Sequence, residues 1–273
     1  MLGFSGVWNF SHLAIYAIGG YVAALLSLHT GLPAVPAVLL GGVAAMAVSV
    51  LLSLPALRLR GIYVALLTFG FGEVIRLLIV SDQTGFTGGT YGLSEYRGFG
   101  LDTLDALTRD RVHYWIGIAL AVVTGLAIFA IIRSPLGSGL IALRDNPALA
   151  AARGISPRVM QMVGFGVSGF FAGIAGSLYA FAFGVVSPTL MGLAPMTLLV
   201  TMLVVGGLGT VTGPIVGTVI MTFVQARLQS WPDVRLIVLG LVLLVMIVAV
   251  PRGIVPLAAK YRRRLADWVD EDD

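Results

Sequence analysis

Eight apolar runs of roughly 20 residues, the length that a helix needs to cross a bilayer core of about 30 Å, occupy most of this chain. Hydrophobic residues make up 58% of the chain and charged residues 11%, against roughly 25% charged in an ordinary soluble domain. The sequence therefore predicts an all-α fold, a polytopic transmembrane helical bundle. Its predicted spans are 10–30, 34–54, 61–80, 114–132, 159–183, 196–211, 213–229 and 235–251.

Two of the breaks between spans are short, "HTGLP" at 29–33 and "GTVTGP" at 209–214. Because the second break is rich in glycine, residues 187–229 also fit one crossing followed by a re-entrant or tilted segment. Both arrangements stay open at this stage.

Orientation follows from the excess of arginine and lysine on the cytoplasmic side of membrane proteins. With both termini in the cytoplasm, most basic residues lie inside, including the "KYRRR" cluster at 260–264. The same orientation makes the connection 81–113 external and the polar insert 133–158 cytoplasmic. We therefore expect one transmembrane domain over 1–273, with these two segments outside the membrane.

The insert "RSPLGSGLIALRDNPALAAARGISP" has the start and stop signals of soluble helices. Ser134-Pro135 and Asn146-Pro147 each combine an N-cap residue with proline in the first turn. Gly154 follows as a residue that tolerates the left-handed conformation at a helix end. The pattern predicts two short helices with a bend at Asp145-Asn146. This pair is either an amphipathic loop on the membrane surface or a docking element for a cytoplasmic partner.

Glu73 is the one acidic residue well inside a predicted span, and Arg76 lies one helical turn further. An ion pair within the helix is geometrically available at this spacing. The pair either fixes the tilt of its helix or lines a translocation route, because intramembrane charges usually mark pathways or partners. Asn9 and His12, three residues apart near the inner end of the first span, are expected to share a helix face and to form hydrogen bonds across helices.

Glycines recur at helical spacing in two places. Such small residues let helix backbones approach closely, so we expect packing surfaces, although Pro214 also allows a broken helix in the second place. The glycines are Gly166, Gly169, Gly173 and Gly176 in the fifth span, and Gly209, Gly213 and Gly217 further along.

The residues needed for several kinds of chemistry are missing. The chain has no cysteine, which excludes disulfides and thiolate metal ligands. No histidine or carboxylate cluster with metal-ligand spacing occurs, and the single lysine, Lys260, lies outside any phosphate-binding loop motif. We therefore expect a non-enzymatic protein with no catalytic residues, no metal, no cofactor and no nucleic-acid partner.

Ordered motifs across nearly the whole chain resemble the branched-chain amino-acid permeases of ATP-binding-cassette importers, in particular the longer of their two membrane subunits. The matching segments are "NFSHLAIYAIGGY" at 9–21, "LRLRGIY" at 57–63, "FGFGE" at 69–73, "FTGGTYGL" at 86–93 and "VVGGLGTVTGPIVG" at 204–217. One or two further helices usually precede the first motif in that family, so either this variant is short or its true start lies upstream.

The resemblance implies a second homologous permease subunit, two cytoplasmic ATPases, an external solute-binding protein and the plasma membrane of a bacterium or archaeon. The insert is similar to the family's cytoplasmic coupling loop, with the signature Glu-Ala-Ala, three residues, then Gly. Ala150 and Gly154 match, whereas Ala148 stands in place of the glutamate and Leu149 in place of the first alanine.

We therefore predict that Arg144, Asp145, Ala150 and Gly154 couple the chain to an ATPase. The implied function is the import of branched-chain amino acids or related small solutes. The alternative is a secondary transporter or channel that works alone, although its usual paired broken helices are not evident.

Overall fold

The computed structural model describes residues 2–59, 61–96, 98–100, 105–250 and 253–257. Contacts divide the chain into two compact units, unit 1 at Met1–Gly192 and unit 2 at Leu193–Asp273. The predicted cytoplasmic cluster at 260–264 lies outside the described residues.

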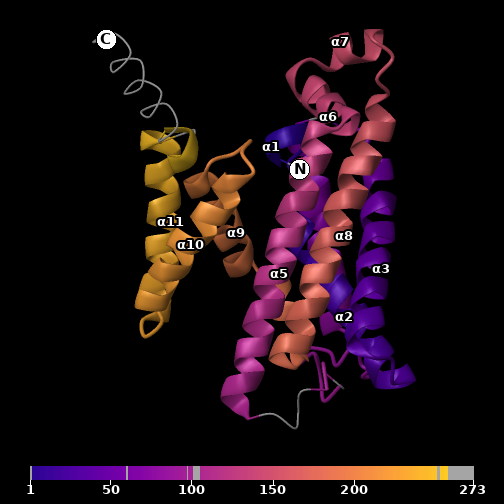
Figure 1. Ribbon diagram of the computed structural model, residues 1–273, viewed down its shortest axis with the longest axis vertical. Coiled ribbons are helices and arrows are strands. Elements are labelled where there is room, and N and C mark those ends of the chain that lie inside the picture. The colour runs from indigo at the N-terminus through magenta and orange to yellow at the C-terminus, as the bar shows by residue number, and fades with distance from the viewer. Residues whose placement is uncertain (1, 60, 97, 101–104, 251–252, 258–273) are drawn as a thin grey trace. The chain divides into compact units, whose positions relative to one another are not determined.

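Helices dominate both units, and each of the eight predicted spans corresponds to one helix in the described part of the chain (Figure 1). Five of these, α2, α3, α4, α5 and α8, are long and apolar enough to cross a membrane. Unit 1 contains α1 (Leu2–Ser5), α2 (His12–Thr30), α3 (Ala34–Ala56), α4 (Ile62–Val80), β1 (Leu93–Ser94), α5 (Ala106–Arg133), α6 (Pro135–Asp145), α7 (Pro147–Ala152), α8 (Pro157–Phe183), β2 (Val185–Val186) and the 3-10 helix η1 (Pro188–Met191).

Local signals set most helix ends where the sequence predicts them. Gly31 ends α2 and Gly184 ends α8, both in the left-handed conformation that glycine adopts without strain. The start of α5 differs, because Asp105 caps it by accepting a hydrogen bond from the Thr108 N–H. The helix therefore begins at Ala106, eight residues before the predicted span at 114.

The centre of unit 1 is a three-helix seam of α2, α3 and α8, whose backbones lie almost in contact. A Cβ added at Gly19 of α2 would collide with the backbone of Gly173 of α8, and one at Gly176 would collide with the Tyr16 carbonyl. On the α3 side, Gly169 lies against Ser49. Because lipid is as apolar as the side chains, such close van der Waals packing is what holds membrane helices together.

Buried hydroxyl groups add hydrogen bonds across the same seam. Ser49 Oγ of α3 donates to the Phe165 carbonyl of α8 at 2.7 Å. Ser177 Oγ of α8 donates to the Gly19 carbonyl of α2 at 2.9 Å. Bonds of this kind contribute about 0.6–2 kcal/mol each in a membrane, so the seam is closed by packing and by polar contacts together.

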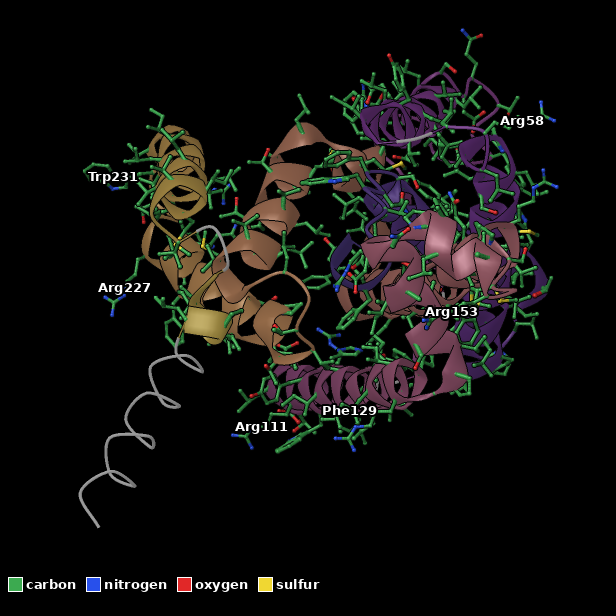
Figure 2. The ribbon with its side chains drawn as sticks, turned by 90° about the horizontal axis from the view of Figure 1, so that it is seen from above. Arg58, Arg111, Phe129, Arg153, Arg227 and Trp231 are labelled. Carbon is green, nitrogen blue, oxygen red and sulfur yellow. The ribbon has the colours of Figure 1, made fainter. Side chains whose placement is uncertain are left out.

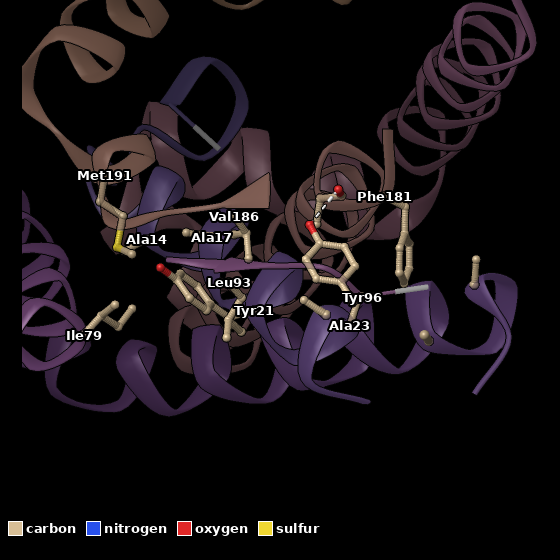
Figure 3. Packing of buried hydrophobic residues seen from close by; sticks show 14 residues of the cluster. Ala14, Ala17, Tyr21, Ala23, Ile79, Leu93, Tyr96, Phe181, Val186 and Met191 are labelled. Atoms are coloured by element: carbon tan, nitrogen blue, oxygen red, sulfur yellow. Dashed lines mark hydrogen bonds between the residues drawn. The ribbon is translucent and has the colours of Figure 1, made fainter. Parts of the chain in front are cut away.

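The connection that follows α4 lies at the end of unit 1 away from the insert (Figure 1), where its residues Leu93 and Tyr96 join a buried hydrophobic cluster (Figure 3). β1 pairs antiparallel with β2, placing Leu93 beside Val186. Tyr96 packs edge-on against Phe181 and donates from its hydroxyl to the Ala180 carbonyl at 2.7 Å. Burial raises the pKa of this phenol, so Tyr96 stays a neutral donor. The connection is therefore ordered on the ends of α2 and α8.

Helix α5 contrasts with the seam, because none of its residues is buried in unit 1. It lies at the edge of the bundle, with Arg111 and Phe129 along it (Figure 2). Its apolar surface suits lipid or another protein chain.

Unit 2 is a group of three shorter helices, α9 (Leu193–Gly206), α10 (Thr212–Arg227) and α11 (Pro232–Ala249). Val205, Met221 and Leu239 form its buried core. With 14 and 16 residues, α9 and α10 are about 21 and 24 Å long at 1.5 Å per residue. Both are shorter than a hydrocarbon core of about 30 Å. This hairpin fits the re-entrant or tilted alternative as well as two crossings.

Replacing Gly176 with Ala tests the seam. The added methyl group meets the Tyr16 carbonyl, a backbone atom that cannot rotate away, and overpacking of this kind costs about 1–3 kcal/mol. We expect a clearly lower melting temperature in detergent, measured by intrinsic fluorescence. In the control Gly125→Ala, on α5, the methyl group has no atom within 4 Å, so the melting temperature should hold or rise. Equal effects of the two variants would contradict the close approach.

Candidate functional site

The polar insert folds into the two short helices that the sequence predicts, α6 and α7, with Asn146 between them (Figure 1). Asn146 caps α7, because its side-chain oxygen accepts from the Leu149 N–H at 3.0 Å. Ser134 precedes α6, but its hydroxyl donates back to the Ile131 carbonyl instead of capping α6. Proline at the first helical position starts both helices.

Gly154 ends α7 with a φ of +81°, in the left-handed region. The Ile155 N–H donates to the Ala150 carbonyl at 3.0 Å, and the Gly154 N–H donates to the Ala151 carbonyl. These two bonds form a Schellman motif, which needs a left-handed residue at its centre. The role that the structure assigns to Gly154 is thus to reverse the chain toward α8.

The predicted coupling residues differ in exposure. Ala150 is only 2% exposed, so it packs inside the insert and is not available to a partner. Its neighbour Leu149 is 50% exposed and is the apolar residue that α7 offers to its surroundings. Asp145 is exposed and accepts from the Arg144 Nε at 2.9 Å. Arg153 follows at the end of α7 (Figure 2).

Arg144 joins the insert to the N-terminal segment, a contact that sequence reasoning missed. Its Nη1 donates to the Gly3 carbonyl of α1 at 2.6 Å. Gly6, with a φ of +69°, lies so close that an added Cβ would be 2.9 Å from the Arg144 Cγ. Residues 141 positions apart make this contact, and no local pattern signals it.

The insert also contacts both helices that it connects. Gly137 of α6 lies against the backbone of Ile131 and Ile132 at the end of α5. A Cβ added at Gly139 would be 2.9 Å from the Met160 sulfur of α8. Helix α6 is therefore in direct contact with α1, α5 and α8.

The segment before α2 continues these contacts to α4. The Phe10 N–H donates to Thr68 Oγ1 of α4 at 3.0 Å, and Thr68 is fully buried. Asn9 Oδ1 accepts from the Ser11 N–H and hydroxyl, which forms the turn into α2. Asn9 thus lies before the helix and does not share a helical face with His12. His12 Nδ1 lies 3.4 Å from the Ser168 hydroxyl of α8.

Glu73 and Arg76 form the intrahelical ion pair that their spacing allows. Arg76 Nε lies 3.0 Å from both carboxylate oxygens of Glu73, and Nη2 makes a further contact. Both side chains are partly exposed in this chain. Glu73 shares its face of α4 with the exposed Leu66 and Leu77.

The predicted glycines lie at two packing surfaces, with one exception. Gly166, Gly169, Gly173 and Gly176 of α8 face α2 and α3, and Gly213 and Gly217 of α10 face α9. Gly209 lies in the turn between α9 and α10 with a φ of +83°. It therefore shares no helix face with Gly213 and Gly217. Helix α10 begins before Pro214, so this proline lies in its first turn and breaks nothing.

The turn after α4 is organised around one carboxylate. Asp82 accepts from the N–H groups and hydroxyls of both Thr84 and Thr87 at 2.6–2.9 Å. These hydrogen bonds lower the pKa of Asp82 well below its usual range. The turn presents Phe86, stacked on His29, and the 91% exposed Tyr91.

These helices, with five long apolar spans in unit 1, define a multi-pass helical membrane protein. Residues 1–247 match the family model described as "Branched-chain amino acid transport system / permease component". The chain belongs to this family.

Curated relatives support the same assignment. The chain is 31% identical over 279 residues to the high-affinity branched-chain amino acid transport system permease protein LivM of Escherichia coli (strain K12) and to the LivM protein of Salmonella typhimurium. Each comparison covers 94% of this chain and 65% of the relative, so the chain spans less than two thirds of the length of these relatives. No solved structure matches.

Replacing Asp82 with Asn tests the turn after α4. Because the folded-state pKa is lowered, the ionised form stabilises the turn at neutral pH, and this support is lost only as the pH falls below the usual carboxylate range. We expect faster amide hydrogen exchange across residues 82–92 in Asp82→Asn at pH 7. The wild type should keep its protection from pH 7 down to about pH 5. Equal exchange in both proteins at pH 7 would contradict this role.

Proposed function

We propose that this chain is a membrane permease subunit of an ATP-binding-cassette importer, which moves branched-chain amino acids or related small solutes into the cytoplasm. Family membership carries the proposal, and the two-helix insert between α5 and α8 supports it. The proposed assembly has a second homologous permease subunit, two cytoplasmic ATPases and an external solute-binding protein.

The distribution of charge supports a cytoplasmic insert. Successive long helices of unit 1 run antiparallel, so α1, the C-terminal end of α3 and the insert share one end of unit 1 (Figure 1). This end carries Arg58, Arg133, Arg144, Arg153 and Arg158. The opposite end has the Asp82 turn, which would receive the solute-binding protein. An arginine-rich end of a multi-pass protein faces the cytoplasm.

A separate motor is part of the proposal, because the sequence contains no phosphate-binding loop. The ATPase would press on the insert, and α6 would pass the movement on through its contacts. Those contacts lead to α5 at Gly137, to α8 at Gly139, and through Arg144 to α1. From there the Phe10–Thr68 hydrogen bond reaches α4.

The Glu73–Arg76 pair is the proposed charged element of the route. A zwitterionic solute carries the same two charges, so its ammonium and carboxylate groups can exchange contacts with the pair. Two opposite charges one helical turn apart are less costly in a membrane than either alone.

Cysteine crosslinking tests the motor contact, and the cysteine-free chain allows single-cysteine variants. We expect Leu149→Cys to crosslink to the ATPase in the assembled transporter, because Leu149 is 50% exposed on α7. Ala150→Cys is the matched control and should not crosslink, because Ala150 is 2% exposed. If neither Leu149→Cys nor any other exposed position of α6 and α7 reaches an ATPase while uptake continues, the coupling role is excluded.

Replacing Glu73 with Gln tests the pair as part of the route. The amide can still accept from Arg76, so the helix and the assembly should form normally. We expect ATP-dependent uptake into proteoliposomes to fall about tenfold, the loss for one charge-assisted contact of about 1.5 kcal/mol. Wild-type uptake in a normally assembled complex would remove the pair from the route. Uptake by the chain alone, without ATP, would overturn the importer proposal itself.

A further inference from the structure

The seam of unit 1 leaves no room for a solute, which limits where a route can lie. Its glycines contact neighbouring backbone, and its buried hydroxyls are used between helices, as with Ser49 and Ser177. Polar groups that could serve a solute must therefore be sought on helix faces that the packing leaves uncovered.

Helix α10 has such a face. It is less apolar than its neighbours α9 and α11, and unlike α9 and residues Ile237–Val248 of α11 it is not one of the shorter apolar helices of the described chain. Gly213, Gly217 and Met221 form its packed side. Thr218 follows Gly217 and Thr222 follows Met221, and Gln225 lies three residues beyond Thr222, so these three form a polar strip along the edge of the packed side.

The exposed surface next to this strip is apolar. Ile215, Val219 and Phe223 repeat at intervals of four residues and are 57%, 53% and 69% exposed. Helix α10 thus presents three different sides: one packed on α9, one apolar and suited to lipid, and one polar.

The side chains of the polar strip make fewer hydrogen bonds than other hydroxyl groups of unit 2. On α9, Thr197 and Thr201 donate to the carbonyls four residues earlier, at 2.9 and 2.7 Å. In the described part of the chain, Thr222 and Gln225 have no side-chain hydrogen bond, and Thr218 has only a 3.8 Å contact to the Met202 sulfur. Unpaired polar groups are costly in hydrocarbon, so this side of α10 needs water or a polar ligand.

We propose that the strip Thr218–Thr222–Gln225 lines the translocation route and binds the solute through hydroxyl and amide groups. The inference rests on the proposed function and adds residues to it. The strip offers donors and acceptors without a fixed charge, which suits small polar solutes and zwitterions. Such groups replace part of the hydration of the solute and bind weakly enough to release it.

Thiol accessibility tests the strip without depending on transport. Thr218→Cys, Thr222→Cys and the controls Val219→Cys and Phe223→Cys are each made in the otherwise cysteine-free chain, within the assembled complex in proteoliposomes. A membrane-impermeant methanethiosulfonate reagent should label the two strip variants and leave both controls unlabelled over the same time. Leucine at saturating concentration should slow labelling of Thr222→Cys.

Transport gives the second measurement. Thr222→Val should lower kcat/KM for uptake about fivefold, as expected for one hydrogen bond of about 1 kcal/mol between uncharged groups, while Val219→Ala should leave it unchanged. The inference is overturned if the reagent labels the control variants and leaves the strip variants unlabelled. It is also overturned if a neighbouring subunit shields the strip from the reagent in every transport state. If wild type shows no ATP-dependent uptake, the proposed function fails, whereas the labelling pattern still reports on the strip.

Discussion

Close backbone contact between α2, α3 and α8 is the constraint on which the rest of unit 1 depends. Lipid provides no hydrophobic drive for helix association, so helices stay together only where their surfaces fit. Gly19, Gly173 and Gly176 allow that fit because they have no side chain, and Ser177 adds a hydrogen bond in the same place. The seam thus acts as a frame, and the ends of its helices carry the insert on one side and the Asp82 turn on the other.

Under the proposed function, motion and transport fall to the elements outside the frame. Helix α6 contacts three other helices of unit 1 through glycines and Arg144. A movement of the insert would therefore be transmitted to all three helices. The polar groups proposed to meet solute lie on α4 and α10 and not in the seam. A rigid support with moving parts around it is also the arrangement of hinge and shear motions in other proteins.

Local patterns in the sequence predicted the helices, the bend at Asn146 and the Glu73–Arg76 pair, because each depends on residues within one or two helical turns. The long-range features were not predictable from one sequence. Arg144 meets Gly3, 141 positions away in the sequence, and the burial of Ala150 depends on how the insert packs once it is folded. Asn9 was expected to share a helix face with His12 because of their spacing alone, which does not detect the turn that the Asn9 side chain makes.

The uncovered α5 has a consequence for how the sequence can change. A side chain on α5 has to satisfy little beyond being apolar, so many substitutions there should be interchangeable. Gly169, Gly173 and Gly176 of α8 face atoms of α2 and α3 so closely that they leave space for hydrogen alone. Evolutionary drift would therefore accumulate along one edge of the bundle and stop at its centre, and two distant relatives would differ most where the chain meets lipid or another protein chain.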